Sequence, residues 1–216
     1  MPAMLPAIAA ALLLQSGTAQ SSSLGHANGV VPPAVTAVRV DRPPSLDGRL
    51  DDPAWALAPP ITGLLQTDPD EGKPVSESTD VRVIYDADAL YVGARLFDSA
   101  PHLIVSRLGR RDANTHSDEF RLLLDSYHDH RTAFEFIVNP AGVKKDVLIG
   151  GDGKLSDDSW DPVWEAATSV DSLGWTVELR IPFSQLRFAR ARAGKRRSPA
   201  PDRGRTRRMD AADDAR

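Results

Sequence analysis

The sequence predicts an all-β protein, an antiparallel β-sandwich. Three observations lead to this fold class. Apolar and polar residues alternate in several short segments, which is the period-two pattern of half-buried strands. These segments recur about every ten residues with turn residues between them, and no helical pattern is long enough to connect parallel strands. A chain of 216 residues, 41% of them hydrophobic, is long enough for one sizeable core.

The first half of the pattern contains three expected strands and one helical turn. Valines open it within 35–40. Residues 81–85 and 90–97 read as a hairpin, because the Asp-Ala-Asp-Ala segment at 86–89 is a turn. Along 90–97 the even-numbered residues face one way and the odd-numbered ones the other. Pro53 follows Asp52 and precedes the segment Ala-Trp-Ala-Leu-Ala, so a short helical turn is expected around Trp55.

The second half adds five expected strands. Residues 120–124 end at Asp125, and 134–138 end at the turn signal Asn-Pro-Ala-Gly at 139–142. Residues 143–149 are the expected hairpin partner of 134–138. The Gly/Asp-rich segment 150–161 is too polar for a core element and is expected to be a loop. Residues 164–170 and 175–181 complete the set.

Composition excludes several classes of protein. The chain has no cysteine, which excludes disulfide miniproteins, zinc–thiolate and iron–sulfur sites, and cysteine nucleophiles. Residues 20–188 carry 16 basic against 26 acidic side chains, a net charge of −10 that argues against nucleic acid as a partner. No stretch reaches the roughly 18 apolar residues that a transmembrane helix needs.

The two ends differ from the middle. Residues 4–14 are an apolar Ala/Leu run with small residues at 17–19, which predicts a signal peptide over 1–19; a buried first helix is the alternative. Residues 20–34 then form a linker, and export to the periplasm, outer envelope or medium is expected. Residues 189–216 hold ten Lys/Arg against four Asp with one large apolar residue, Met209, so a disordered basic tail or an out-of-frame segment is expected.

Residues 35–188 contain an ordered series of short motifs. They are LDGRLDDPAW at 46–55, VIYD at 83–86, LYVG at 90–93, DEF at 118–120, LD at 124–125, FIVNPAG at 136–142, SWDPVWEA at 159–166, GWTVE at 174–178, IPF at 181–183 and LRF at 186–188. Each motif alone is common, and their order is what is specific. In that order the series resembles the family 9 carbohydrate-binding modules and, more narrowly, the version at the N-terminus of large bacterial envelope proteins of unknown function.

The resemblance implies a β-sandwich that binds carbohydrate without catalysis. Better-known relatives clamp a terminal sugar between two tryptophans. Where the first would stand, just before the acidic strand, this chain has Asn114, Thr115 and His116. The second would lie after the Ile-Pro motif, where this chain has its Arg-rich segment, and relatives would continue past 186–188 into another core strand. The resemblance therefore implies a truncated copy with an open sheet edge.

Sugar recognition needs a flat aromatic face and planar polar groups that bind vicinal hydroxyls. Trp160 and Trp164, at the end of the Gly/Asp segment, are the candidate aromatic rings, although Trp164 also fits the core. Trp55 and Trp175 lie on apolar faces and are expected in the core. The candidate polar groups cluster around another expected loop: Arg110, Arg111, Asp112 and Asp118.

Calcium is a second candidate ligand. Four carboxylates within ten residues lie among glycines, and hard oxygen ligands on a flexible loop suit Ca²⁺. The spacing is not that of an EF-hand, and a solvated acidic loop is the alternative. The residues are Asp152, Asp157, Asp158 and Asp161.

Catalysis is the third candidate. Asp118 or Glu119 with Asp125 would supply the two carboxylates of a glycosidase, but alternation sends neighbouring carboxylates to opposite faces of a strand. His128 and His130 read as a polar hairpin tip, and no nucleophile elbow or phosphate loop is present in the sequence.

The sequence therefore favours an exported, non-catalytic carbohydrate-binding sandwich. The alternative is a structural or interaction domain of a cell-envelope protein that has lost sugar binding. No enzyme activity is expected.

Overall fold

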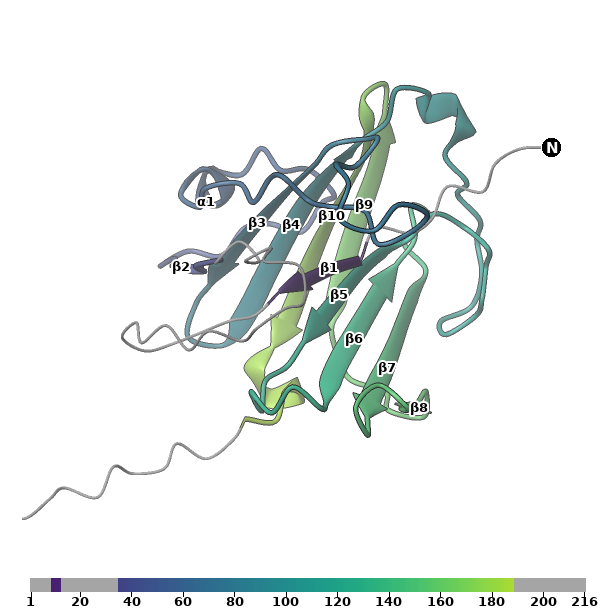
Figure 1. Ribbon diagram of the computed structural model, residues 1–216. Helices are drawn as coiled ribbons and strands as arrows, with labels where there is room; N and C mark the ends of the chain where they lie inside the picture. The colour runs from purple at the N-terminus through teal and green to yellow at the C-terminus, as the bar shows by residue number, and fades with distance from the viewer. Residues whose placement is uncertain (1–8, 13–34, 189–216) are drawn as a thin grey trace, which may run out of the picture.

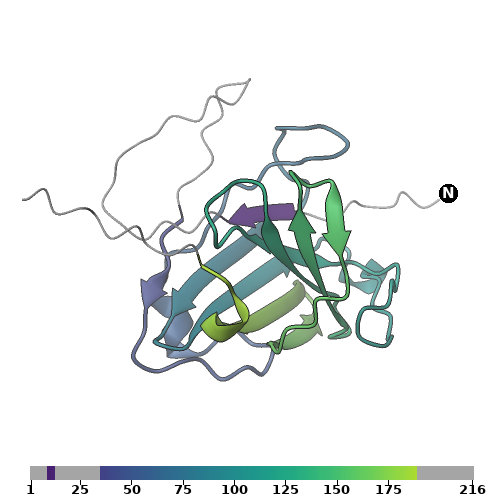
Figure 2. The same cartoon turned by 90° about the horizontal axis from the view of Figure 1, so that it is seen from below.

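The computed structural model describes residues 9–12 and 35–188. They form two five-stranded sheets, of strand order β1-β5-β6-β7-β8 and β2-β3-β4-β10-β9, which stack as two layers (Figure 1, Figure 2). Most neighbouring strands run antiparallel. The predicted β-sandwich is confirmed. In the described part of the chain no helix is long and apolar enough to span a membrane.

The strands and helical turns have the following bounds: β1 Ala9–Leu12, β2 Val38–Arg39, α1 Pro53–Ala56, β3 Thr79–Tyr85, β4 Ala89–Phe97, η1 Pro101–Leu103, β5 Phe120–Leu124, β6 Ala133–Val138, β7 Lys144–Gly150, β8 Leu155–Asp157, β9 Glu165–Asp171, β10 Gly174–Pro182 and η2 Phe183–Gln185. Most of the expected strands lie within two residues of these bounds. The first is the exception, since only Val38 and Arg39 of 35–40 form a strand. The short helix at Trp55 is where the sequence predicts it.

Three edge features escape the period-two pattern. β8 lies inside the segment expected to be a loop. All its residues are exposed, and as the edge strand of its sheet it pairs with β7 through its backbone. β2 pairs with β3, and β1 with β5, in parallel. Alternation reports which face a side chain occupies but not the direction of the neighbouring strand.

β1 falls within the apolar run predicted as a signal-peptide core. Its backbone pairs with β5 in the register Ala9 to Arg121 and Leu12 to Leu124. The remainder of the predicted signal peptide, the predicted linker at 20–34 and the predicted basic tail at 189–216 lie outside the described residues. The predicted division into these segments stays a prediction.

The main core fills the space between the sheets. Leu90, Val92, Ala94 and Leu96 of β4 all point into it, as the alternation predicts. The facing sheet contributes Phe120, Leu122 and Leu124 from β5 and Phe134, Phe136 and Val138 from β6. This assignment leaves the intervening residues of β5, β6 and β7 on the outer face of their sheet.

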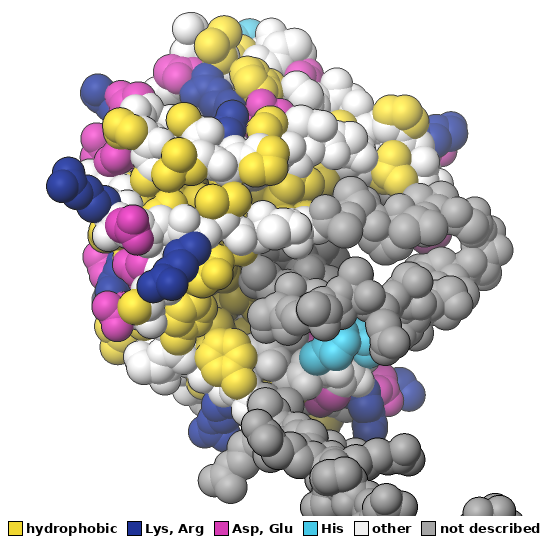
Figure 3. Space-filling model, turned by 90° about the vertical axis from the view of Figure 1, so that its left-hand side faces the viewer, with side chains coloured by type: hydrophobic (Ala, Val, Ile, Leu, Met, Phe, Trp, Pro, Cys, Tyr) yellow, Lys and Arg dark blue, Asp and Glu magenta, His cyan; other side chains and the backbone are white. Residues whose placement is uncertain are grey.

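A second apolar cluster covers the outer face of the other sheet. Trp55 of α1 packs there against Ile84 and Tyr91, and all three are nearly inaccessible. Gly93 of β4 makes room for this contact, because a Cβ there would lie 3.1 Å from the Trp55 ring. Figure 3 views the molecule from the side of β2 and α1, where apolar side chains alternate with charged ones of both signs.

Glu178 in the middle of β10 anchors this covering segment to the sheet. Its side chain is 0% exposed and accepts three hydrogen bonds, from Trp55 Nε1 at 2.8 Å, from the Asp47 amide at 2.9 Å and from the Gly48 amide at 2.8 Å. Burial raises the pKa of Glu178, while the three N–H donors oppose that shift. Two motifs of the sequence, at 46–55 and 174–178, therefore meet at one carboxylate.

Replacing Glu178 by Ala should destabilise the fold strongly. The substitution leaves three buried donors without an acceptor and creates a cavity, so we expect a loss of about 3–5 kcal/mol in the free energy of unfolding. Urea denaturation followed by fluorescence measures it. The control is Glu165→Ala, whose exposed carboxylate pairs with Arg180 at 2.9 Å and should contribute less than about 1 kcal/mol. Equal losses in the two variants would contradict this role of Glu178.

Candidate functional site

Trp164 and Trp160 do not form an exposed aromatic platform. Trp164 is 2% exposed, stacks edge-on with Phe136 at 5.2 Å and donates its Nε1–H to Asp146 at 3.0 Å. Its ring offers no face to a sugar, which corrects the prediction that it binds ligand and supports the alternative that it belongs to the core. Trp160 is half-buried and packs against Phe134 and Phe136 at 4.8 and 5.6 Å. Trp55 and Trp175 are buried, as the sequence predicts.

The predicted polar cluster is split between two places. Arg111 contacts Asp146 at 2.6 Å, the Pro162 carbonyl at 2.7 Å and Asp161 at 2.7 Å, so it fixes the segment before β9 onto β7. Burial raises the pKa of Asp146, an acidic residue on the inward side of β7. Arg110 and Asp112 are exposed beside this contact. Asp118 lies elsewhere, in a pocket described below.

The four aspartates proposed to bind calcium do not converge. Asp152 pairs with Arg131 at 2.9 Å, and Asp161 pairs with Arg111. Asp157 accepts the Ser159 hydroxyl at 2.6 Å, and Asp158 is exposed. Among residues 9–12 and 35–188, no group of three or more His, Asp or Glu side chains is placed to hold a metal ion. The structure does not bring these four carboxylates together, because arginines and local groups engage three of them, and the calcium site stays a prediction.

The structure contains a hollow at one end of the sandwich, which we call the end pocket. It lies where β3, β5 and β10 begin and β4 ends. Thr79, Leu96 and Trp175 form its floor; they stand side by side on β3, β4 and β10, since Leu96 pairs with both of the others. The volume is about 150 Å³. Pockets for drug-sized ligands hold roughly 300–1,000 Å³, so the end pocket suits a small ligand.

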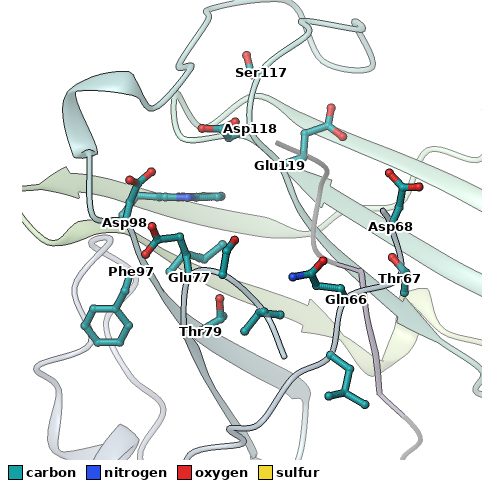
Figure 4. Close-up of a pocket in the computed structure, with 15 residues that line it drawn as sticks. Gln66, Thr67, Asp68, Glu77, Thr79, Phe97, Asp98, Ser117, Asp118 and Glu119 are labelled. Carbon is teal, nitrogen blue, oxygen red and sulfur yellow. The ribbon is translucent and has the colours of Figure 1, made fainter. Parts of the chain in front are cut away.

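Acidic side chains surround the end pocket (Figure 4). Five carboxylates line it and no Lys, Arg or His of the described residues does. Glu119 pairs with Arg121 at 2.6 Å, and the other four have no ion-pair partner within the described ranges. The pocket therefore concentrates negative charge. The five residues are Asp68, Glu77, Asp98, Asp118 and Glu119.

Each half-buried carboxylate in this ring uses one oxygen to hold local backbone or side chain. Glu77 accepts the Ser99 hydroxyl at 2.5 Å, Asp98 accepts the Ala100 amide at 2.7 Å, and Asp118 accepts the Val105 amide at 3.0 Å. Burial raises the pKa of Asp118, the charge of Asp98 adds to that shift, and the Val105 amide opposes it.

A second hollow lies on the outer face of the sheet β5-β6-β7-β8, and we call it the face groove. Its volume is about 270 Å³. Ile137, Val147, Ile149 and Leu155 provide aliphatic surface. Arg121, Ile137 and Lys145 stand in one row across three strands, because Arg121 pairs with Ile137 and Ile137 with Lys145. Glu119 lines both hollows.

Polar groups of both signs surround this aliphatic surface. The Arg121 guanidinium bridges Glu119 at 2.6 Å and Glu135 at 3.4 Å, which holds its plane in a fixed orientation. Asn114, Lys145 and Ser156 complete the polar lining. The groove thus presents an amide, a hydroxyl, a guanidinium, an ammonium group and two carboxylates beside apolar atoms.

Sequence reasoning found Asp118 but missed most residues of both hollows. Gln66, Glu77 and Asp98 come from loops whose arrangement no local spacing encodes. Arg121, Glu135 and Lys145 follow a readable signal, since they occupy outward positions of three consecutive strands. Charged side chains at such positions are common, so the pattern alone does not indicate a site.

Comparison with known proteins finds distant similarity in fold. No protein-family model matches the chain, and no curated protein is similar to it in sequence. A family 9 carbohydrate-binding module from Caldicellulosiruptor kristjanssonii in complex with cellotriose is 18% identical at a TM-score of 0.48, over 68% of this chain and 66% of that one. The same organism's family 9 module in complex with glucose is 19% identical at a TM-score of 0.47, over 68% of this chain and 69% of that one. A proposed carbohydrate-binding protein from Bacteroides uniformis is 15% identical at a TM-score of 0.48, over 69% of this chain and 72% of that one.

These structures include the family that the motif series resembles. At such identities the similarity concerns the fold, and this chain spans slightly less than two thirds of the length of the cellotriose-bound module.

Asp118→Asn should change how stability depends on pH. Because the pKa of Asp118 is raised in the folded state, its contribution is present below its unfolded pKa of about 3.9 and is lost as pH rises through the folded value. Asn can still accept the Val105 hydrogen bond without carrying charge. We therefore expect the variant to gain stability relative to the unmodified protein between about pH 4 and pH 7. Urea denaturation at both pH values measures this, and parallel pH profiles would contradict it.

Proposed function

We propose that this protein is a non-catalytic carbohydrate-binding module and that a neutral sugar binds in the face groove. One observation carries the proposal: Glu119, Arg121 and Glu135 form an oriented row of planar polar groups beside aliphatic side chains. Sugar hydroxyls both donate and accept hydrogen bonds, so a ligand of this kind uses carboxylates and guanidinium together.

Each polar group of the groove has a defined part in such binding. The Arg121 guanidinium has more N–H donors than its two carboxylate partners occupy, and the remaining ones are available to a hydroxyl oxygen. Glu135 and Glu119 accept from hydroxyl hydrogens. Lys145 donates from the opposite side, beyond Ile137. The C–H face of a sugar ring would lie against the aliphatic residues, with less contact energy than an aromatic ring provides.

The wider setting follows from the sequence. We propose a signal peptide at 1–19, a linker at 20–34, the binding module at 35–188 and a basic tail at 189–216. Export through the signal peptide would place the module in the periplasm, the outer envelope or the medium, where it would assist polysaccharide breakdown or attachment to glycan. The net charge of −10 over residues 20–188 favours neutral glycans over acidic ones.

A structural or interaction domain of the envelope is the second candidate function. It is favoured by the burial of the tryptophans: Trp55, Trp164 and Trp175 are each at most 4% exposed, and Trp160 is half-buried. Three of the four tryptophans are therefore closed to a stacking sugar, and Trp160 is only partly accessible.

Arg121→Ala should weaken binding of neutral oligosaccharides at least tenfold, about 1.4 kcal/mol, because it removes the central donor and releases both glutamates. Isothermal titration of the full chain with glucose, cellotriose and other neutral oligosaccharides measures the affinity. Arg49→Ala is the matched control, since Arg49 is exposed and does not line the groove. No binding to any neutral glycan, or equal binding by the two variants, would favour the structural domain.

A further inference from the structure

The floor of the face groove is apolar and scarcely exposed. Ile137 and Val147 lie on the outer face of their sheet, a face that in antiparallel sheets is commonly solvated, yet they are only 4% and 6% exposed. Ile149 continues this floor along β7. The part of a ligand that reaches these side chains leaves water, so it should be small and apolar, as a methyl group is.

Two polar groups stand next to this apolar pair. Glu135 and Ile137 of β6 lie opposite Val147 and Lys145 of β7, so the four side chains form a block on one face of the sheet. Neighbouring strands are about 4.8 Å apart, and alternate residues of one strand are about 7 Å apart. The acceptor Glu135 and the donor Lys145 therefore occupy opposite corners of a small block, and the two aliphatic residues occupy the other corners.

Both polar corners have capacity for a ligand. Glu135 accepts one long hydrogen bond within the described residues, from Arg121 at 3.4 Å. Lys145 forms no ion pair within residues 9–12 and 35–188. The formal charges that line the groove balance, since Glu119 and Glu135 oppose Arg121 and Lys145. An uncharged ligand with a donor for one corner and an acceptor for the other fits this lining.

We infer that the face groove selects sugars that carry an acetamido group, such as N-acetylglucosamine. The amide N–H donates to Glu135, the carbonyl oxygen accepts from Lys145, and the methyl group packs against Ile137 and Val147. In a planar trans amide the N–H and C=O bonds point in opposite directions, as the two polar corners require. The inference rests on the proposed function, because it names the class of sugar that binds at the same site.

Two other classes of sugar satisfy fewer of these groups. A 6-deoxy sugar brings a methyl group to the apolar corners but no N–H for the carboxylate beside them. A sugar with a free amine offers Glu135 a charged donor, but it brings no methyl group and places a positive charge near Arg121 and Lys145. The volume of about 270 Å³ is below that of pockets for drug-sized ligands, so the groove suits one sugar unit.

Isothermal titration of the full chain with four sugars tests the inference. The probes are N-acetylglucosamine, N-formylglucosamine, glucose and fucose. We expect N-acetylglucosamine to bind at least tenfold more tightly than glucose, because its amide gains a charge-assisted hydrogen bond at each polar corner. N-formylglucosamine keeps the N–H and the C=O but lacks the methyl group, so it should bind about fourfold more weakly than the acetyl form.

The outcomes separate this inference from the proposed function. Equal affinities for N-acetylglucosamine and glucose, equal affinities for the acetyl and formyl forms, or tighter binding of fucose than of N-acetylglucosamine would overturn the inference and leave the proposed function standing. Binding of neither these sugars nor any neutral oligosaccharide would contradict both.

A variant of the apolar floor locates the site. Val147→Thr keeps the shape of the side chain and puts a hydroxyl at an apolar corner, so the fourfold preference for the acetyl over the formyl form should fall below twofold. Val170→Thr is the matched control, since Val170 is 45% exposed and does not line the groove, and it should keep the full preference. An unchanged preference in Val147→Thr would overturn the assignment. The formyl comparison on the unmodified protein tests the inference even if this variant does not fold.

Discussion

The buried carboxylate of Glu178 determines which surfaces of this sandwich remain available. By accepting hydrogen bonds from Trp55 and from the backbone at Asp47 and Gly48, it holds the segment before β3 against the sheet β2-β3-β4-β10-β9. The requirement is strict at Gly48, whose φ is +84° and where a Cβ would lie 2.7 Å from the backbone of Thr168. One outer face is therefore covered by the chain itself, and the hollows lie on the other outer face and at the end between the layers.

Acidic residues perform two different tasks inside this fold. Glu178 and Asp146 are almost inaccessible, and each accepts an indole N–H from a tryptophan. Their hydrogen bonds offset the cost of burial, so they act as structural anchors. The carboxylates at the end of the sandwich are only half-buried, and Glu77, Asp98 and Asp118 each leave one oxygen without a hydrogen bond to a described residue. The fold thus encloses one set of carboxylates completely and leaves the other set accessible to solvent.

The sequence predicted the fold better than the site, for a physical reason. Burial acts on every second residue of a strand, so β3 to β7, β9 and β10 are predicted from local patterns. β1, β2 and β8 depend on backbone pairing at sheet edges, which imposes little on side chains. Trp164 sits in a motif that fits either a platform or a core, and its contact with Asp146 decides between them. The end pocket unites residues 66, 77, 98, 118 and 175, whose proximity only the tertiary structure creates.

Glu119 lines both hollows, and its carboxylate forms an ion pair with Arg121 in the face groove. A molecule that drew Glu119 towards the end pocket would weaken its ion pair with Arg121 in the groove, and a molecule that held Glu119 in the groove would have the reverse effect. If Glu119 responded in this way, thermodynamic linkage would require the coupling between the two hollows to be equal in both directions. A shared side chain is therefore sufficient to couple two hollows without any movement of the backbone.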